Sequence, residues 1–244
     1  MTTDTETPKP LGERKERIAT DFTRVARGYD LLCALNPGYI RHLGMSANRL
    51  KLAGDASVLD LCCGTGLSTA ALRKSYPGVS ITGLDASAGM LAVARNKKNL
   101  SDVTWIEGDG MNPAAAGATG PYDGILMAYG IRNMVDPDLC LTRLHELLKP
   151  GGSLCLHEYS VADSRRSQWT WKLVTSTIVI PLGLVFTGTT SIYRYLRESV
   201  LEFDGVAALE ERLKRAGFID VRTEPMDGWQ RGIVHSFLAR RAEQ

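Results

Sequence analysis

The sequence predicts an α/β fold: a doubly wound, mostly parallel sheet of seven strands, with a C-terminal antiparallel hairpin and an α-helical cap. Three observations lead to this prediction. Between residues 57 and 160, short apolar runs that suit strands alternate with helical patterns, which is typical of a parallel sheet covered by helices on both faces. A strongly apolar segment then interrupts the alternation, and two further strand-like runs close the chain. With 244 residues, 44% of them hydrophobic, the chain is long enough to bury one large core.

We expect a single domain over residues 16–244. The polar residues 1–15 predict a flexible tail, and they contain no apolar core of a secretory signal. A helical element is expected over residues 16–52, interrupted at the Asn-Pro-Gly of residues 36–38. Residues 161–200 are expected to form the cap, inserted where an acceptor substrate would bind.

The individual elements follow from hydrophobic periodicity. Strands are expected where apolar residues run consecutively or alternate, and helices where they recur every three or four positions. This gives strands at 57–61, 79–85, 103–109, 122–130, 153–160, 219–226 and 232–241, and helices at 67–76, 87–97, 137–149 and 206–218. Helix ends are marked by Pro77, by Pro150 and by Gly217. The arrangement is Rossmann-like, and the last two strands are expected to pair antiparallel.

Charge and cysteine content exclude several classes of function. The formal net charge is +2, and Lys and Arg are spread along the chain, so nothing favours a nucleic-acid partner. An odd number of cysteines without CxxC spacing argues against a disulfide framework: Cys33, Cys62, Cys63, Cys140 and Cys155. Adjacent thiolates such as those of Cys62 and Cys63 cannot easily bind one zinc ion. We expect a cytoplasmic protein without a metal site.

The segment SVLDLCCGTGLSTAAL, residues 57–72, places Gly64 and Gly66 directly after the first strand. Ligands of open parallel sheets bind beyond the carboxyl ends of the strands, and glycine lets the backbone approach them closely. Asp85 ends the next strand, 21 residues after Gly64, at a spacing that suits a carboxylate binding two ribose hydroxyls. The alternative is a purely structural turn followed by an N-capping acid.

A dinucleotide is a second candidate ligand for this loop. Its GxGxxG fingerprint is incomplete, because Thr69 occupies the third glycine position. Asp60 precedes the loop, where a carboxylate would repel a pyrophosphate but could accept a hydrogen bond from an ammonium group. A cationic cofactor that joins adenosine to an amino acid, S-adenosyl-L-methionine, therefore fits better.

These motifs resemble those of class I S-adenosyl-L-methionine-dependent methyltransferases. VLDLCCGTG resembles the first motif, GLDASAGMLAVAR the second and EGDGMNP the third. The resemblance implies that Asp85 binds the ribose and that Met90 lies near the adenine, which Asp109 and Gly110 would flank. The expected cofactor-binding residues are Asp60, Cys62, Gly64, Thr65, Gly66, Asp85, Ala86, Met90, Asp109, Gly110, Met111 and Ala128.

Within this superfamily the sequence is similar to the ubiquinone/menaquinone biosynthesis C-methyltransferase family over nearly the whole chain, from Asp21 to Phe237. The likeness lies in YGIRNMVDPDLCLTRLHELLKPGGSLCLHEYS, which carries GxRN, KPGG and Glu-x-Ser, in YRYLRESV and in FTRVARGYDLL. It implies transfer of a methyl group to a ring carbon of a prenylated quinol, in particular demethylmenaquinol to menaquinol or the ubiquinone-pathway equivalent. The implied partner is a lipophilic small molecule.

Several positions depart from the family pattern. The Tyr-Asp-x-Met-Asn element reads YDLLC at residues 29–33, Gly44 replaces a downstream Trp, and Ala128 replaces a serine. Cys62 is bulkier than the Gly or Ala expected at the start of the loop. Two other interpretations therefore stay open: O- or N-methylation of another small lipophilic or specialised metabolite, and a catalytically inactive binding module that keeps the fold.

Arg132 and Asn133, which follow the fourth strand, are the expected catalytic residues. A guanidinium stays protonated and can hold the oxyanion of a quinol or polarise a water, and Asn133 can orient that water. A structural salt bridge from Arg132 to Asp136 or Glu158 is the alternative. The expected substrate contacts are Tyr29, Tyr129 and Glu158.

The apolar segment from Leu173 to Tyr193 contains no charged residue and is long enough to cross a membrane. Pro181 and Gly183 interrupt it, and it lies between two α/β segments, which favours a cap or an interfacial segment. Three roles stay open for it: a lid, a tunnel for a polyprenyl tail, and a peripheral contact with the inner face of the membrane. A homodimer is also left open.

Overall fold

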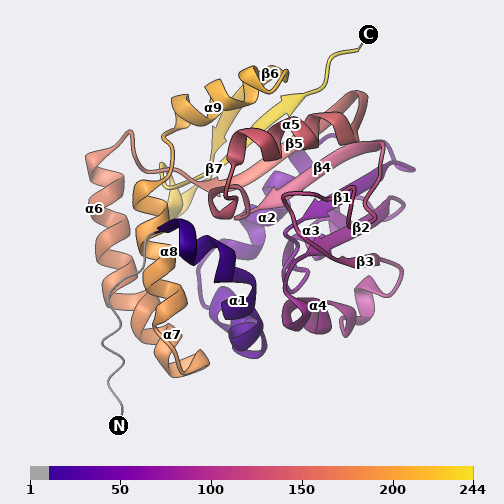
Figure 1. The fold of residues 1–244 in the computed structure, drawn as a ribbon. Coiled ribbons are helices and arrows are strands. Elements are labelled where there is room, and N and C mark those ends of the chain that lie inside the picture. Colours follow the sequence, from indigo (N-terminus) through magenta and orange to yellow (C-terminus); the bar gives the residue numbers. More distant parts are fainter. Residues whose placement is uncertain (1–10, 244) are drawn as a thin grey trace.

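The computed structural model describes residues 11–243, and residues 1–10 and 244 lie outside the described part. Its strands form one seven-stranded sheet in the order β3-β2-β1-β4-β5-β7-β6, and β7 runs antiparallel to both of its neighbours (Figure 1). The strands are β1 (Ser57–Leu61), β2 (Ser80–Asp85), β3 (Thr104–Glu107), β4 (Tyr122–Ala128), β5 (Leu148–Tyr159), β6 (Ile219–Pro225) and β7 (Val234–Arg240). The predicted fold class is confirmed, and the strand order reverses between β1 and β4, where ligands of such sheets bind.

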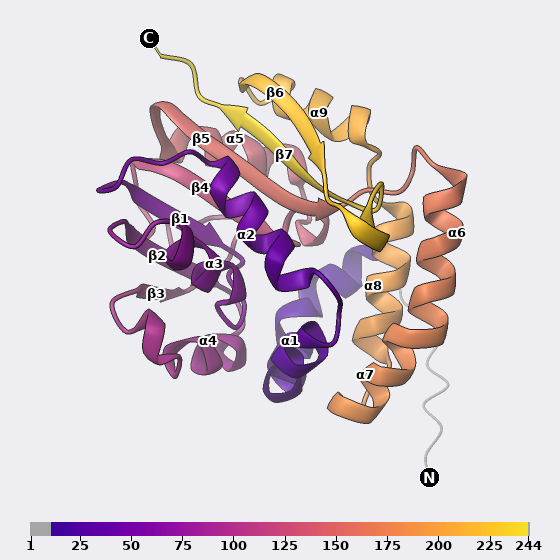
Figure 2. The same ribbon diagram turned by 180° about the vertical axis from the view of Figure 1, so that it is seen from behind.

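Helices cover both faces of the sheet, as Figures 1 and 2 show from opposite sides. One face carries α2 (Tyr39–Arg49) and α3 (Leu67–Ser75), and the other carries α5 (Pro137–Leu147) and α9 (Val206–Arg215). α4 (Ala88–Arg95) packs beside β2 and β3. The apolar sides of these helices supply the core: Leu43, Ala47 and Leu72 on the first face, and Leu141, Leu144, Leu209 and Leu213 on the second.

Strand alternation decides which way the side chains of β1 point. Leu59 and Leu61 pack in the core beneath α5 and α9, whereas Val58 packs in the core beneath α2 and α3. Asp60 shares the direction of Val58 and therefore meets α3. A carboxylate thus stands inside the protein, directly below the glycine loop.

A separate group of helices stands beyond the carboxyl ends of the parallel strands (Figure 1). It consists of α1 (Leu11–Ala34), α6 (Arg165–Val174), a π-helical turn (Thr175–Val179), α7 (Ile180–Thr187) and α8 (Ser191–Glu202). Two glycines allow close packing here: a Cβ at Gly28 of α1 would overlap the carbonyl oxygen of Phe186, and a Cβ at Gly183 would overlap the ring of Tyr193. α7 is therefore held tightly between α1 and α8.

Two boundaries differ from the prediction by five residues, and the other strand and helix boundaries differ by three or fewer. α1 begins at Leu11, so the expected tail is wrong for residues 11–15, where Glu, Arg and Lys are strong helix formers; residues 1–10 lie outside the described part. β5 begins at Leu148 and not at residue 153. The strand continues because Gly151, at φ +75, donates its N–H to the carbonyl of Arg241, which extends the pairing with the C-terminal segment through the turn.

Candidate active site

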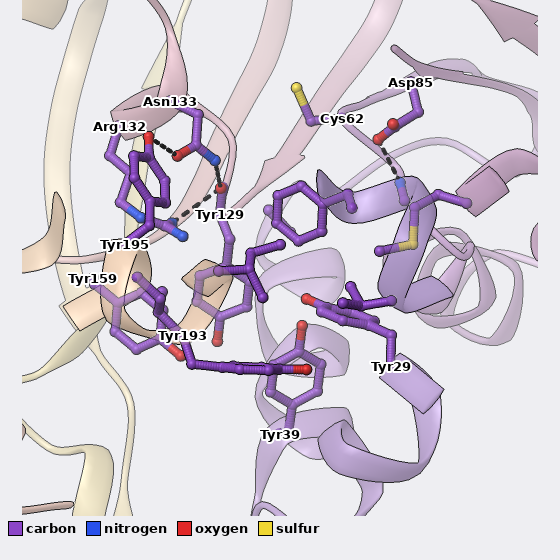
Figure 3. A pocket seen from close by; sticks show the side chains of 17 residues that line it. Tyr29, Tyr39, Cys62, Asp85, Tyr129, Arg132, Asn133, Tyr159, Tyr193 and Tyr195 are labelled. Carbon is purple, nitrogen blue, oxygen red and sulfur yellow. Dashed lines mark hydrogen bonds between the residues drawn. The ribbon is translucent and has the colours of Figure 1, made fainter. Parts of the chain in front are cut away.

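A cavity lies at the carboxyl ends of β1, β2 and β4, next to α1 and α8 (Figure 3). This site cavity contains about 810 Å³ of empty space, part of which opens to solvent. Nine predicted site residues line it: Tyr29, Cys62, Gly64, Asp85, Met90, Ala128, Tyr129, Arg132 and Asn133. The structure therefore brings cofactor candidates and acceptor candidates together in one place.

The loop after β1 leaves open space for a ligand at Gly64. This residue has φ +54, and a Cβ built there would meet no atom within 4 Å. Cys62 also has a positive φ of +58, which costs a non-glycine residue on the order of 1 kcal/mol. Gly66 serves packing instead, because a Cβ there would lie 3.1 Å from Leu100 and 3.2 Å from Trp105. Gly66 thus faces the protein interior, away from the site cavity.

Asp85 fixes this loop from the end of β2. Its Oδ2 accepts a hydrogen bond from the N–H of Gly64 at 2.8 Å (Figure 3), and its Oδ1 accepts one from the N–H of Ser87 at 2.8 Å. Burial raises the pKa of Asp85 above its usual value, and the two backbone hydrogen bonds oppose that rise. Each carboxylate oxygen keeps a free lone pair. With the open space at Gly64, this carboxylate on the cavity wall fits the ribose of the predicted cofactor.

Asp60 lies beneath the loop and does not line the site cavity. Its Oδ2 accepts hydrogen bonds from Ser68 Oγ at 2.8 Å and Thr69 Oγ1 at 2.6 Å, and no described residue hydrogen-bonds its Oδ1. Burial raises the pKa of Asp60 to about 7; the two hydroxyl hydrogen bonds oppose the rise, and the charge of Asp85 adds to it. Thr69, at the third glycine position of the dinucleotide fingerprint, is therefore a partner of this acid.

Asp60 should make the stability of the protein depend on pH. Its pKa is about 7 in the folded protein against an ordinary 3.8, so its favourable contribution is complete below pH 3.8 and is lost as the pH rises through 7. Urea unfolding at pH 5 and at pH 8 should differ by about 2–3 kcal/mol on this account. The Asp60→Asn variant should lose that part of the difference. An unchanged pH dependence in this variant would contradict the assignment.

Thr65 joins the glycine loop to α1. Its Oγ1 donates a hydrogen bond to Asp30 Oδ1 at 2.5 Å, and Asp30 Oδ2 lies 2.7 Å from Lys97 Nζ. On the same helix, Thr23 shares a hydrogen bond with Ser87 Oγ at 2.8 Å. α1 is thus tied to the loops after β1 and β2, which carry most of the cofactor candidates.

Besides Asp60, Thr65 and Gly66, four more predicted cofactor residues lie outside the lining of the site cavity: Ala86, Asp109, Gly110 and Met111. Asp109 is exposed and closes its own turn by accepting the N–H of Met111 at 2.9 Å. Gly110 lies nearer, since a Cβ there would come within 3.2 Å of Cys62 Sγ. Motif position therefore identified the loops that surround the site cavity, and five of the twelve predicted cofactor residues line it.

Arg132 lines the site cavity and also forms one of the salt bridges considered as its alternative role. Its Nη1 lies 2.7 Å from Glu158 Oε1 and donates to the carbonyl of Tyr129 at 3.0 Å, and its Nε donates to Ser199 Oγ at 3.3 Å. Burial lowers the pKa of Arg132, but the Glu158 carboxylate outweighs this and raises the pKa above its ordinary value. Glu158 is fully buried and pairs with Arg132. The predicted contact of Glu158 with the substrate is therefore corrected to a contact with Arg132.

Asn133 is held from two sides (Figure 3). Its Nδ2 donates to the carbonyl of Tyr129 at 3.1 Å, and its Oδ1 accepts from the hydroxyl of Tyr195 at 3.0 Å. The side chain therefore has a fixed orientation at the edge of the site cavity. Its role in orienting a water stays a prediction.

Sequence reasoning missed most of an aromatic wall. Six tyrosines line the site cavity, and we call them the tyrosine wall: Tyr29, Tyr39, Tyr129, Tyr159, Tyr193 and Tyr195. The ring centroid of Tyr129 lies 5.5 Å from that of Tyr39 and 4.7 Å from that of Tyr159. Burial raises the pKa of Tyr29, Tyr39 and Tyr129 well above the ordinary value, so their hydroxyls stay protonated. Tyr29 and Tyr129 are among the predicted substrate contacts, and YRYLRESV, one of the family-like segments, contains Tyr193 and Tyr195.

A second, apolar groove adjoins the site cavity and shares part of the tyrosine wall. It contains about 1200 Å³ of empty space, partly open to solvent, between α1, α6 and α7. Its apolar lining includes Leu32, Leu35, Trp171, Ile178, Leu182 and Trp229. Four residues of the tyrosine wall line both spaces: Tyr29, Tyr39, Tyr159 and Tyr193. The two spaces are therefore neighbours across one layer of aromatic side chains.

The fold and the site agree with the class of methyltransferases that use S-adenosyl-L-methionine. Two solved structures share the fold over almost their whole length. The [4+2]-cyclase SpnF has a TM-score of 0.68 at 16% identity, with 94% of this chain and 97% of that chain covered. The plantazolicin methyltransferase BamL, in complex with a desmethylPZN analog and SAH, has a TM-score of 0.65 at 14% identity, with 96% and 98% covered. At such identities the likeness shows the fold alone, and the cyclase shows that this fold hosts other reactions.

Sequence relatives decide the family. The profile of the ubiE/COQ5 methyltransferase family matches residues 11–239. The demethylmenaquinone methyltransferase of Lactococcus lactis is 30% identical over 237 residues, which cover 94% of this chain and 92% of that protein. The ubiquinone/menaquinone biosynthesis C-methyltransferase UbiE of Bradyrhizobium diazoefficiens is 32% identical, with 92% and 91% covered. The chain belongs to the ubiE/COQ5 methyltransferase family, and the predicted family, enzyme class and cofactor are confirmed.

Proposed function

We propose that this protein transfers a methyl group to a ring carbon of a prenylated quinol, namely demethylmenaquinol to menaquinol or the ubiquinone-pathway equivalent. One observation carries the proposal: the site cavity, which contains Asp85 and Arg132, adjoins the apolar groove across the tyrosine wall. A prenylated quinol likewise joins a polar ring, which suits the site cavity, to an apolar tail, which suits the apolar groove. The names of the two bacterial relatives support this class of acceptor.

S-adenosyl-L-methionine supplies an already electrophilic methyl group, so the protein mainly has to align the reactants. Gly64 leaves room for the cofactor, and Asp85 holds the ribose hydroxyls. Arg132, paired with Glu158, supplies a fixed positive charge beside the acceptor oxygen. When this oxygen loses its proton, the neighbouring ring carbon becomes nucleophilic, and the positive charge stabilises the oxyanion. Because a guanidinium does not release its own proton, Arg132 would stabilise the oxyanion, and Asn133 would orient the water that takes the proton of the acceptor hydroxyl. The methyl group would pass from the sulfonium sulfur to the ring carbon and leave a neutral thioether, and the ring carbon would then lose its hydrogen as a proton to water, which restores the aromatic ring.

We also place α6 and α7 against the inner face of the membrane, from which a prenylated acceptor would be taken. Within residues 11–243, Arg165–Thr187 is a helical stretch long and apolar enough to cross a membrane, and it contains an 18-residue window with a mean hydropathy of 1.4. One side of it packs on the protein, because Trp171 and Thr175 are at most 1% exposed, and lipid therefore cannot surround it. Trp169 and Val185 are 65% and 74% exposed, so they are free to enter a membrane surface.

Charging the exposed side of α7 should weaken membrane binding. The double variant Leu184→Asp/Val185→Asp should bind vesicles of phosphatidylethanolamine and phosphatidylglycerol at least about 30-fold more weakly, because each of the two apolar side chains contributes on the order of 1–2 kcal/mol when buried in the membrane. Sedimentation with vesicles measures the change. Leu139→Asp, at an exposed position of α5, is the matched control and should bind as the wild type does. Equal binding by all three proteins would contradict the proposed contact.

The proposed reaction is tested with a reduced, short-chain demethylmenaquinone and S-adenosyl-L-methionine. We expect a product with one added methyl group on a ring carbon, identified by NMR, and a higher KM for the same ring without its prenyl tail. A methyl group on oxygen would favour the O-methyltransferase alternative. Cofactor binding without any methylated quinol would refute the quinol proposal. Accumulation of the demethyl species in cells that lack the gene would support it.

A further inference from the structure

A chain of buried hydrogen bonds leads from the tyrosine wall to the opposite side of the molecule. Tyr129 Oη lies 2.9 Å from His157 Nε2, and His157 Nδ1 lies 2.7 Å from Ser46 Oγ. Ser46 Oγ lies 2.6 Å from Ser236 Oγ, which accepts a hydrogen bond from Arg49 Nη1 at 2.8 Å. Arg49 lines a cleft that opens to solvent. We call Arg49, Ser236, Ser46 and His157 the orienting chain; the methyl-transfer scheme above gives it no role.

The arginine at the far end decides the direction of every hydrogen bond in the orienting chain. A guanidinium only donates, so Ser236 Oγ accepts from Arg49. The proton of Ser236 is then donated to Ser46, and the proton of Ser46 is donated to Nδ1 of the histidine. In the reverse direction, among the described residues the thiol of Cys155 would be the one partner left for the proton of Ser236. A thiol is a weak acceptor, and a buried hydroxyl without a good partner is costly.

His157 transmits this direction as a neutral ring. Burial, together with the charges of His42, Arg49 and His235, lowers its pKa to about 3. An imidazole that accepts at Nδ1 carries its proton on Nε2, and this proton is donated to Tyr129 Oη. The hydroxyl of Tyr129 therefore accepts from the histidine, and its own proton is donated on the other side, where the hydroxyl of Tyr159 is its neighbour and where an acceptor oxygen could take that place.

Tyr129 is held so that its hydroxyl stays in the site cavity. Its φ of +58 is strained for a residue other than glycine. Its N–H donates to the carbonyl of His157 at 2.7 Å, its own carbonyl accepts from Arg132, and its ring packs against Tyr159. A strained backbone that places one side chain against a buried histidine, while its carbonyl holds Arg132, points to a task for that side chain.

We propose that Tyr129 donates a hydrogen bond to the ring oxygen of the acceptor, beside Arg132, and that the orienting chain fixes the direction of this bond. The inference rests on the proposed function, because it needs an acceptor oxygen in the site cavity. Tyr129 is then a catalytic residue, and the members of the orienting chain are positioning residues.

The direction can be measured on the free, full-length protein. ¹⁵N NMR of histidine-labelled protein at pH 7 should show His157 protonated at Nε2 and unprotonated at Nδ1, with its signals assigned by their loss in His157→Gln. Arg49→Lys keeps a donor-only group and should preserve this tautomer, whereas Arg49→Met should shift the population toward Nδ1–H. An Nδ1–H tautomer in the wild type would overturn the proposal, whether or not the protein methylates a quinol.

The hydroxyl itself is tested by kinetics. Tyr129→Phe should lower kcat for the quinol about 10–100-fold and leave cofactor binding unchanged. The acidic limb of its pH–rate profile should move up by about one pH unit, because the acceptor hydroxyl ionises less readily without the donor.

Tyr76→Phe is the matched control, because its hydroxyl donates to the backbone carbonyls of Ala47 and Asn48 outside the site cavity. This variant should keep the wild-type rate and pH profile. Wild-type kinetics in Tyr129→Phe would overturn the proposal. If the wild type itself fails to methylate a quinol, the proposed function fails, and the tautomer of His157 still decides the direction of the orienting chain.

Discussion

Replacing Arg132 with Met should lower the free energy of unfolding by about 3–5 kcal/mol, because the variant leaves the Glu158 carboxylate buried without its counter-charge. The donors that remain to this carboxylate are the backbone N–H groups of residue 132, at 3.5 Å, and of Tyr159, at 2.9 Å. Urea unfolding followed by circular dichroism at pH 7 measures the loss. Turnover should fall as well, so activity has to be measured at a urea concentration and temperature at which the variant is folded.

A double variant and a surface pair supply the controls. Arg132→Met/Glu158→Met removes both charges and should recover most of the lost stability, since apolar residues often replace a buried ion pair without net cost. Lys149→Met breaks a pair with Asp123 in which the side chains are 43% and 34% exposed, and it should cost less than about 1 kcal/mol. Equal losses at Arg132 and Lys149 would show that burial of the first pair is not the source of the effect.

Asp85→Asn should weaken binding of S-adenosyl-L-methionine about 10–100-fold. The variant loses the charge that strengthens hydrogen bonds to the ribose hydroxyls. It also turns an amide N–H₂ toward the N–H of Gly64 or of Ser87, so that a donor faces a donor in the loop that shapes the site. Isothermal titration calorimetry with the cofactor measures the affinity.

Asp109→Asn is the matched control for this loss of charge. Asp109 is exposed and accepts only the N–H of Met111 among the hydrogen bonds of the described residues, so its substitution should change cofactor affinity less than about 3-fold. A large loss in Asp109→Asn would restore the predicted role of this residue beside the adenine. Unchanged affinity in Asp85→Asn would place the ribose elsewhere.

The parts of the site that depend on local pattern could be predicted from the sequence. Residues 57–72 change from consecutive apolar residues to helical spacing, and Gly64 takes the positive φ that the turn between them requires. Parallel pairing then brings the end of β2 beside the end of β1, which places Asp85 next to Gly64. Strand, turn, helix and the position of the acid all follow from neighbours in the sequence and one rule of sheet topology.

The tyrosine wall and the orienting chain could not be predicted in this way, because tertiary contacts create them. Ser46 and Ser236 meet across 190 positions of the chain, and a single serine on a helix or a strand carries no pattern. Glu158 shows the same limit. Its place near the end of β5 suggested the substrate as its partner, but the partner that the fold supplies is Arg132. Which charged side chains pair inside a core depends on which of them lose contact with water on folding. The hydrophobic periodicity of the sequence carries no information about this.

The tyrosine wall borders both the site cavity and the apolar groove, and this has a consequence for inhibition. An adenosine analogue joined to a prenyl chain by a linker that passes this aromatic layer would engage both spaces at once. Once the adenosine half is bound, the prenyl half would bind at a high effective concentration. The avidity of such a linked ligand can exceed either separate affinity by about 10²–10⁴-fold. Methyltransferases that lack a neighbouring apolar space would bind only the nucleoside half, so the geometry itself would supply selectivity.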